Sequence, residues 1–303
     1  MTRKEFLLEK FEEIRIRRTA AESAKFYAVP GAYRVDPFRM ADHLWYVGDK
    51  KVCAHLIETP EGHILIDSGY PGAAHLLIDS IWRAGFDPAD VRWILHSHAH
   101  MDHFGASEDF RAMFGTKLAI GAVDAESMRQ YPQRAMMDWG ANPFAPIPTF
   151  DKELEDGEIF EFGGVKIRCV LSPGHTVGTM SFFFDVADNG QTYLAGTFGG
   201  AGRSALQLEH MTFCECPTDL PQQMLKTLEM LKKEPVMVQL GNHPKNSNTF
   251  EKRERQLREG GNPFVDGTTW PAFLEETRRK TLEEIRRNEK LERELDSAVD
   301  VED

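Results

Sequence analysis

The stretch His96-Ser97-His98-Ala99-His100-Met101-Asp102-His103 is the feature around which this chain is organised. Its last six residues contain four side chains that bind metal ions well, three imidazoles and one carboxylate. Neutral imidazole and carboxylate are the ligands that Zn²⁺ takes where no thiolate is present. From an extended segment His98 and His100 point the same way, and Asp102 and His103 then turn toward a neighbouring point. This spacing favours two metal ions side by side.

The flanking residues place this stretch on a turn between a strand and a helix. Residues 91–95, Val-Arg-Trp-Ile-Leu, predict a short buried strand, and residues 104–114 predict a helix. His96 forms a second His-x-His pair with His98, but no carboxylate follows at the required place in that frame. We therefore interpret His96 as a strand-end residue that supports the ligands. The alternative for the whole stretch is a histidine-rich surface loop, because short motifs also match by chance.

Two more histidines follow apolar, β-branched runs. Pro173-Gly174-His175-Thr176 comes after a predicted strand at 165–171, and Gly241-Asn242-His243-Pro244 comes after a short run at 236–238. A single histidine of this kind is more often a structural residue. Two of them together with the cluster at 98–103 complete a set of candidate ligands, which indicates a metal site assembled from three turns.

Taken together, these motifs resemble the metallo-β-lactamase superfamily. The match consists of Leu65-Ile66-Asp67-Ser68-Gly69, the H-x-H-x-D-H cluster, the Pro-Gly-His-Thr turn and the last histidine, and it covers roughly residues 39–260. The order of the motifs is most similar to the subclass B3 β-lactamases. The resemblance implies an α/β fold, the αβ/βα four-layer sandwich, in which helices cover the outer faces of two sheets.

The resemblance also implies a role for each residue of the set and two Zn²⁺ per chain. The implied ligands are His98, His100 and His175 for the first metal ion and Asp102, His103 and His243 for the second. Asp67 is implied to be a buried residue that supports the ligand loop. A charged side chain directly after the apolar run Ile64-Leu65-Ile66 is costly without partners, which agrees with that role.

Composition excludes several classes of protein. The 303 residues are 41% hydrophobic and 28% charged, which is ordinary for a globular protein with a large core. The net charge of −12 argues against a nucleic-acid groove, so a small-molecule substrate is expected. The charged residues 1–18 predict neither a signal peptide nor a membrane span. The four cysteines follow no zinc spacing, and a reduced, cytoplasmic protein is the expectation.

We expect three parts along the chain: an N-terminal helical arm at 1–30, the hydrolase domain at 31–262, and a charged C-terminal helix and tail at 263–303. The arm and the C-terminal helix are expected to pack on the domain or to join copies in a homo-oligomer. The expected strands are 38–47, 52–59, 63–66, 91–95, 117–120, 158–162, 165–171, 179–186, 191–195 and 236–239. The expected helices are 3–25, 71–84, 104–114, 123–130, 221–233, 249–260 and 273–303.

Residues 131–150 contain four prolines and show no regular periodicity. A long segment of this kind inside a compact domain is usually functional or mobile. Its apolar residues fit a flap that covers the substrate, and Trp139 and Phe144 are the candidate contacts. A loop buried under the domain or at a subunit contact explains the composition equally well.

A site with two zinc ions predicts a hydrolase, because a water held by the metal ions loses a proton near pH ~7 and becomes the nucleophile as metal-bound hydroxide. The resemblance implies that Asp102 orients this nucleophile. The first hypothesis is a B3-like enzyme that opens a lactam. The alternatives are a cytoplasmic lactonase, esterase or thioesterase of the same fold, and an iron-dependent oxidoreductase of the superfamily.

One segment bears on the choice. Thioesterases of the glyoxalase II type and many lactonases carry a bridging Asp where this chain has Tyr193-Leu194-Ala195-Gly196-Thr197-Phe198-Gly199-Gly200. The absence of a carboxylate there resembles subclass B3. The B3 enzymes, however, carry an Asp-Ser-x-Ser pattern at this point, and here only Thr197 offers a hydroxyl. Thr197 and Arg203 are therefore the candidate anchors for a substrate carboxylate.

Overall fold

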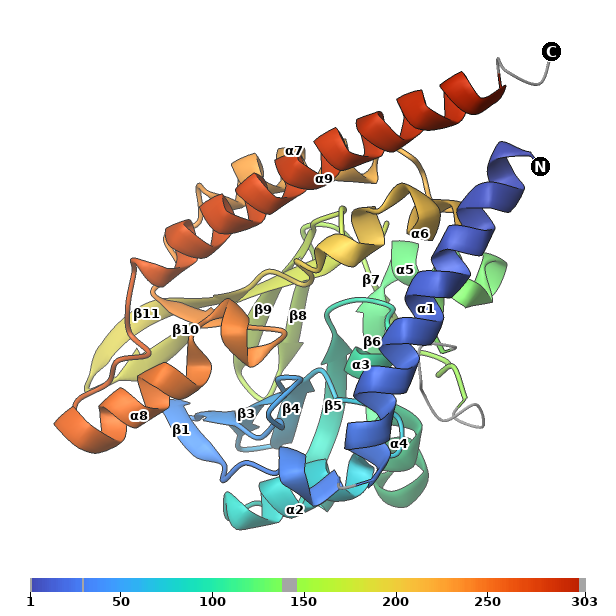
Figure 1. The fold of residues 1–303 in the computed structure, drawn as a ribbon. Coiled ribbons are helices and arrows are strands. Elements are labelled where there is room, and N and C mark those ends of the chain that lie inside the picture. The colour runs from blue at the N-terminus through green and yellow to red at the C-terminus, as the bar shows by residue number, and fades with distance from the viewer. Residues whose placement is uncertain (1, 29, 138–145, 300–303) are drawn as a thin grey trace.

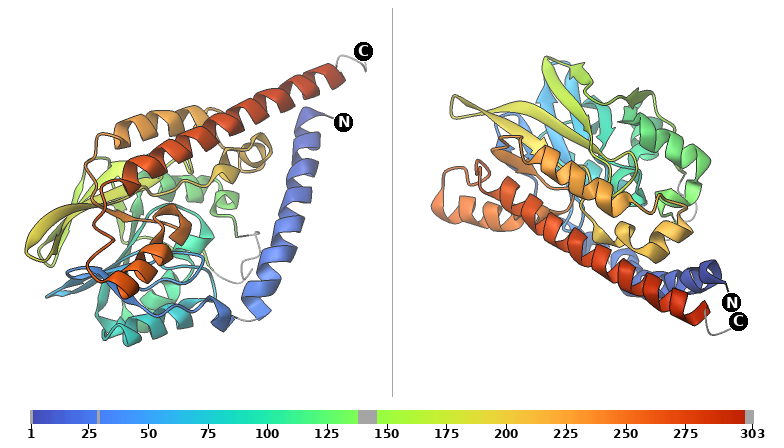
Figure 2. Two further views of the ribbon diagram at one scale, coloured as in Figure 1. Left: turned by 60° about the vertical axis from the view of Figure 1, so that its left-hand side comes forward. Right: turned by 90° about the horizontal axis from the view of Figure 1, so that it is seen from above.

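The computed structural model describes residues 2–28, 30–137 and 146–299 of the chain (Figure 1). Two β-sheets lie face to face in the middle of the molecule, and helices cover their outer sides (Figures 1 and 2). This arrangement is the α/β four-layer sandwich that the sequence predicts.

Seven of the described strands form the first sheet, in the order β1-β2-β3-β4-β5-β6-β7. Their bounds are β1 Phe38–Ala41, β2 Leu44–Tyr46, β3 His55–Thr59, β4 Gly62–Ile66, β5 Val91–His96, β6 Lys117–Gly121 and β7 Lys152–Leu154. Strands β4 to β7 are parallel to one another. The carboxyl ends of β4 and β5 therefore lie at the same edge, where Asp67 and the histidine cluster follow them.

Five of the described strands form the second sheet, in the order β12-β11-β10-β9-β8. Their bounds are β8 Ile159–Phe162, β9 Val165–Leu171, β10 Met180–Asp188, β11 Gln191–Thr197 and β12 Val238–Leu240. Strands β8 to β11 form antiparallel pairs, whereas β12 is parallel to β11. The loop that follows β9 and the loop that follows β12 carry His175 and His243.

The helices connect the strands and cover the sheets. Their bounds are α1 Arg3–Ala28, α2 Ala74–Arg83, α3 Met101–Phe104, α4 Ser107–Phe114, α5 Ala122–Gln130, α6 Leu208–Phe213, α7 Leu220–Leu231, α8 Thr249–Glu259 and α9 Thr269–Val299. The beginning of α1 and the end of α9 lie close together (Figures 1 and 2), and Arg3 on α1 pairs with Glu292 on α9 at 3.0 Å.

Alternating side chains along the strands build the core on both sides of each sheet. Phe182 and Phe184 of β10 pack between the sheets, whereas Phe183 packs outward against α7 and α9. Ile64 and Ile66 of β4 likewise face inward, and Leu65 faces the helices α2 and α4. Full burial of such a side chain stabilises the fold by about 1.5–3 kcal/mol. These two faces fix the strand ends and hence the loops that follow them.

Two expected elements are divided in the structure. The strand expected at 38–47 is a hairpin, β1 and β2, because His43 adopts a φ of +60° and the chain turns back at Asp42-His43. The helix expected at 104–114 is broken at Gly105, whose N–H donates to the Gly69 carbonyl at 2.8 Å. A Cβ at Gly105 would lie 2.0 Å from Pro71 N, so this close approach requires glycine. The short elements β7 and α6 were not predicted.

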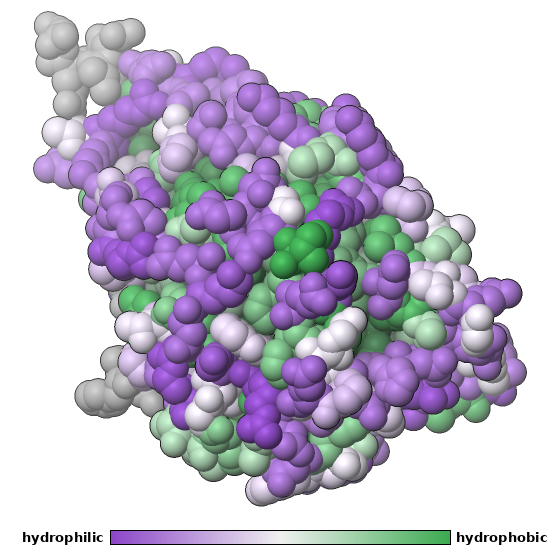
Figure 3. Space-filling model, turned by 180° about the vertical axis from the view of Figure 1, so that it is seen from behind, coloured by the Kyte–Doolittle hydropathy of each residue, from purple (hydrophilic) through white to green (hydrophobic). Residues whose placement is uncertain are grey.

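The rear face of the molecule is mainly hydrophilic. In the rear view of Figure 3, hydrophilic residues cover most of the outline, and hydrophobic residues form smaller groups between them. Among the described residues, every helix is either too short or too polar to cross a bilayer.

Replacement of His55 by phenylalanine is expected to reduce the acid sensitivity of folding. His55 on β3 is buried, its Nε2 has no hydrogen-bond partner among the described residues, and burial lowers its pKa to about 4. Between pH 4 and 6.5 the unfolded chain therefore binds more protons than the native state, so acidification favours unfolding. Urea unfolding of the metal-free protein measures how much stability is lost between pH 7 and pH 5. This loss should be smaller by about 2 kcal/mol in His55→Phe than in the wild type.

The control for this measurement is His75→Phe, since His75 on α2 is exposed. Equal losses of stability on acidification in the wild type and in His55→Phe would contradict a neutral, buried His55.

Candidate metal centre

Four of the six candidate ligands come from the loop after β5 and from helix α3. Strand β5 ends at His96, the chain bends through residues 97–99, and His100 is extended, with φ and ψ of −101° and 146°. Helix α3 then begins and carries Asp102 and His103 on its first turn. The side chains of His98, His100 and His103 are at least nine-tenths buried, and Asp102 is partly exposed. An apolar strand followed by a one-turn helix thus concentrates four polar side chains at one edge of the sheet.

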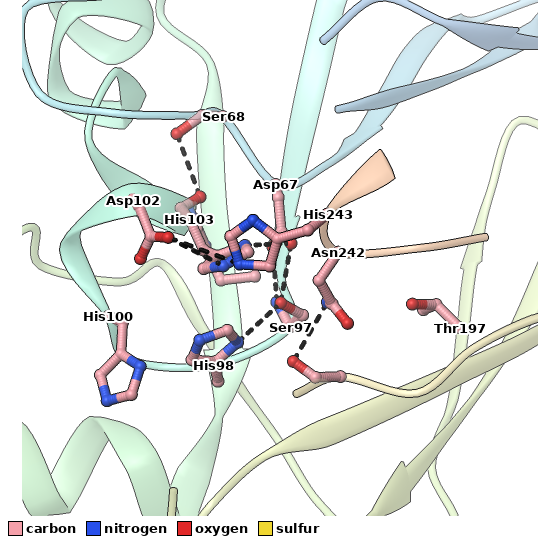
Figure 4. Close-up of polar contacts among 12 residues, drawn as sticks. Asp67, Ser68, Ser97, His98, His100, Asp102, His103, Thr197, Asn242 and His243 are labelled. Atoms are coloured by element: carbon pink, nitrogen blue, oxygen red, sulfur yellow. Dashed lines mark hydrogen bonds and ion pairs between the residues drawn. The ribbon is translucent and has the colours of Figure 1, made fainter. Parts of the chain in front are cut away.

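The second sheet delivers the other two histidines to the same point. The ring centroid of His175 lies 4.6 Å from that of His98 and 4.6 Å from that of His100. The His98 and His103 centroids are 4.1 Å apart, and those of His103 and His243 are 5.3 Å apart. The imidazoles therefore form a row in the order His175, His98, His103, His243, and Figure 4 shows the last three converging beside Asp102.

The potential ligand atoms fall into two groups, of which the second contains His98 in place of the implied His243. One atom from each of His98, His100 and His175 lies within 4.8 Å of the others, and the same holds for His98, Asp102 and His103. The Asp102 Oδ2 lies 3.5 Å from His103 Nε2 and 3.7 Å from His243 Nε2. The structure thus brings all six residues together, with His98 between the two groups.

The chemistry of these side chains fits bound metal ions. The Nε2 atoms of His98 and His103 are buried without a hydrogen-bond partner among the described residues, which is costly unless a ligand binds there. Burial and the neighbouring imidazoles hold the pKa of His98 and His100 well below its ordinary value, and burial lowers the pKa of His175 to about 4. Neutral rings with free nitrogen lone pairs are what a divalent metal requires.

Backbone carbonyl groups hold the outer two rings in place. His175 Nδ1 lies 2.8 Å from the Gly202 carbonyl oxygen, and His243 Nδ1 lies 2.7 Å from the Lys51 carbonyl oxygen. These acceptors fix Nδ1 as the protonated nitrogen, so Nε2 of each ring is left to face the site. A Cβ at Gly200 would lie 2.5 Å from His175 Cδ2, and one at Gly202 would lie 2.7 Å from its Cε1. Glycine is required here because the backbone passes against the ring.

Asp67 supports the cluster from behind (Figure 4). It follows β4 with a φ of +62° and is only 2% exposed. Its carboxylate accepts hydrogen bonds from the Ser97 N–H at 2.8 Å, the Ser97 hydroxyl at 2.7 Å and His103 Nδ1 at 2.8 Å. Burial opposes ionisation, but the charge and hydrogen bonds of these neighbours hold the pKa of Asp67 below its ordinary value. Asp67 thereby orients His103 with Nε2 toward the row.

Asp124 on α5 is a residue of the site that sequence reasoning missed. It is 1% exposed and accepts hydrogen bonds from the Ala99 N–H at 2.9 Å, the Thr176 hydroxyl at 2.7 Å and the Gly178 N–H at 2.8 Å. It therefore ties the loop of His98 and His100 to the loop of His175. Burial raises its pKa to about 6. Acidic residues are common in the first turn of helices, so the sequence contains no signal that singles it out.

His96 is not part of the row. Its Nδ1 lies 2.8 Å from the Ala119 carbonyl oxygen and its Nε2 lies 2.7 Å from Ser107 Oγ, so both ring nitrogens have protein partners. Ser107 in turn contacts Ser68 at 2.8 Å, next to Asp67. His96 thus links the end of β5 to the start of α4. Because both of its ring nitrogens have protein partners, it is not a candidate metal ligand.

A cavity of about 950 Å³ opens over the metal centre and is lined by His100, Asp102, His175 and His243. Arg203, a candidate substrate contact, also lines it, and so do residues of α9. Thr197 is 1% exposed and lies apart from the imidazoles in Figure 4, outside the lining of the cavity. The other two candidates, Trp139 and Phe144, lie outside the described residues.

Known proteins share the fold and part of the sequence of this chain. The model of the metallo-beta-lactamase superfamily matches residues 48–189. The structure is similar to the native FEZ-1 metallo-beta-lactamase from Legionella gormanii, with 27% identity, a TM-score of 0.76, and coverage of 85% of this chain and 98% of that one. The fold is also that of BJP-1, a subclass B3 metallo-beta-lactamase of Bradyrhizobium japonicum, with 23% identity, a TM-score of 0.76, and coverage of 86% and 97%.

Among curated sequences, a hydroxyacylglutathione hydrolase of Acidiphilium cryptum (strain JF-5) is 30% identical over 114 residues, which are 38% of this chain and 38% of that protein. The chain thus spans less than half the length of this relative. The matched family region includes Asp67, the cluster at 98–103 and His175, whose contacts are described above. Residues 48–189 of this chain, which form part of the four-layer sandwich and carry most of the candidate ligands, are therefore similar to the metallo-beta-lactamase superfamily.

Proposed function

We propose that this protein is a hydrolase with two zinc ions that opens a lactam ring, in the manner of subclass B3. The observation that carries the proposal is the row of imidazoles with two buried, unpartnered Nε2 atoms. The Asp102 carboxylate lies beside this row, and Asp102 lines a cavity large enough for a small molecule. Two zinc ions bound in this row supply Lewis acidity, which activates a water and polarises a carbonyl group.

The remaining chemistry is assigned to residues of the chain. The ligands are those proposed from the sequence: His98, His100 and His175 in one group, and Asp102, His103 and His243 in the other. Asp102 lies on the cavity side of the row, and we assign to its carboxylate the orientation of the attacking water and the acceptance of its proton. Asp67 and Asp124 hold the two ligand loops in the productive arrangement.

The packing of residues 199–202 supports a B3-like site. Gly200 and Gly202 pass directly against the His175 ring, so a side chain at either position has no room beside the imidazole. Residues 193–200, where thioesterases of the glyoxalase II type carry a bridging Asp, contain no carboxylate. A second candidate, hydrolysis of an ester, thioester or lactone, draws support from the 30% identity to a hydroxyacylglutathione hydrolase.

Metal analysis combined with a substrate panel tests this proposal. Protein purified with zinc is expected to hold about two zinc ions per chain and to hydrolyse the cephalosporin nitrocefin, and a chelator should abolish turnover until zinc is returned. Faster opening of lactones than of nitrocefin would favour the second candidate. Iron in place of zinc, or less than one metal ion per chain with undiminished turnover, would contradict the proposal.

A further inference from the structure

Basic side chains surround the cavity in an otherwise acidic protein. Lys51, Arg203, Lys245 and Lys280 line it, together with the carboxylates of Asp102, Asp266 and Glu276. Asp266 lies 3.6 Å from Lys252, a cation outside the lining. Lys280 is balanced by Glu276, which lies 3.1 Å away on the same helix. For the other three, no carboxylate among the described residues lies within the 4.0 Å of an ion pair. The chain carries a net charge of −12, so this local excess of positive charge is opposite to the average of the molecule.

The backbones of Lys51, Arg203 and Lys245 lie beside the two ends of the imidazole row. Lys51 supplies the carbonyl group that holds His243, and Lys245 follows His243 by two residues. Arg203 directly follows Gly202, whose carbonyl group holds His175. The row runs from His175 through His98 and His103 to His243, with neighbouring centroids 4.6, 4.1 and 5.3 Å apart. Positive charge is therefore placed at both ends of the centre rather than at one.

Positive charge at both ends of the imidazole row is unfavourable unless an anion binds there. The proposed zinc ions bring positive charge that the single ligand carboxylate of Asp102 does not neutralise, and nearby lysine and arginine side chains add to the repulsion. A negatively charged ligand that reaches both ends relieves it, and basic side chains on the wall of a cavity also raise the local concentration of such a ligand. Arginine in particular forms paired hydrogen bonds with carboxylates.

We propose that the substrate carries two carboxylates, one on each side of the bond that is cleaved. Lys51 and Lys245 bind the carboxylate at the His243 end, and Arg203 binds the carboxylate at the His175 end. The inference rests on the proposed hydrolase function and narrows its substrates to dianionic amides, esters or thioesters. A neutral lactone or a substrate with a single carboxylate leaves one end of the row without an anion.

Four aryl esters with the same scissile bond test the proposal on the zinc-loaded protein. Phenyl butyrate carries no carboxylate. 4-Carboxyphenyl butyrate carries one on the leaving group, and phenyl hydrogen glutarate carries one on the acyl group. 4-Carboxyphenyl hydrogen glutarate carries both. Each carboxylate is expected to raise kcat/KM by about threefold to fivefold, the effect of an exposed ion pair. Arg203→Gln should remove the gain from one carboxylate, and the double variant K51Q/K245Q should remove the gain from the other.

Matched controls separate these effects from a general change of charge. Arg286→Gln and Lys226→Gln each remove one positive charge from an exposed residue outside the cavity and should leave the preferences unchanged. Because Lys51 contacts His243 through its backbone, Lys51→Gln keeps that hydrogen bond. High salt should weaken the preference for the dianionic ester.

A binding experiment decides the inference independently of turnover. In the four ether analogues a CH2 replaces the ester carbonyl; the dianionic member is 5-(4-carboxyphenoxy)pentanoic acid. Calorimetry with zinc-loaded protein should show that it binds at least about threefold more tightly than either monoanion, and that Arg203→Gln removes this difference. Equal affinities across the ethers, or preferences that survive in both variants, would overturn the proposal. Absence of ester hydrolysis by zinc-loaded protein with a retained ether preference would instead contradict only the hydrolase function.

Discussion

Replacement of His98 by glutamine is expected to abolish both metal binding and catalysis. Among the described residues, His98 alone belongs to both groups of ligand atoms, and its buried Nε2 has no protein partner. The variant should hold one zinc ion or none per chain, and kcat/KM should fall by more than about 100-fold, since residues that merely support ligands are already worth 10- to 100-fold. Zinc content by mass spectrometry and initial rates on the best substrate of the panel measure the two effects.

The matched control is His75→Gln, which changes an exposed histidine on α2 far from any candidate ligand. It should retain the zinc content and rate of the wild type. If His98→Gln also retained both, the row of imidazoles would not be the metal centre, and the proposed function would lose its basis.

Replacement of Asp124 by alanine is expected to damage stability and metal affinity together. The change leaves the buried N–H groups of Ala99 and Gly178 and the Thr176 hydroxyl without their acceptor. Unfolding free energy should fall by about 3–5 kcal/mol, because each unsatisfied buried donor costs about 1–3 kcal/mol. Zinc affinity should fall by about 10- to 100-fold, because the loops of His98 and His175 lose their common anchor. Urea unfolding of the metal-free protein and competition with a zinc chelator measure these effects separately.

Two further variants make this result interpretable. Asp124→Asn keeps one acceptor oxygen and should fall between the wild type and Asp124→Ala in both measurements. Asp185→Ala removes an exposed carboxylate on β10 and should change neither. A variant at Asp124 with full stability but weakened zinc affinity would place its role in the site alone, and one with unchanged zinc affinity would refute the assignment of Asp124 as a positioning residue.

Local sequence patterns were sufficient for much of the fold. The apolar runs at 91–95 and 165–171 became β5 and β9, because their side chains alternate between two buried faces. Patterns failed where a long-range contact decides the conformation. The break in the expected helix at Gly105 depends on the loop at Gly69 and Pro71. The residues next to Gly105 in the sequence do not predict this break. The turn at His43 lies within a run of alternating residues, so only strand pairing shows where the chain reverses.

For the site, local motifs were enough to single out the six candidate ligands, because His-x-His-x-Asp-His and two turn-borne histidines are chemically distinctive. How these residues meet depends on the tertiary structure. The order of the imidazoles along the row, the clamp made by Asp124, and the cations at each end come from segments up to 192 positions apart, such as Lys51 and His243. Such contacts depend on how two sheets pack, and packing is set by the buried faces of the whole chain rather than by any local motif.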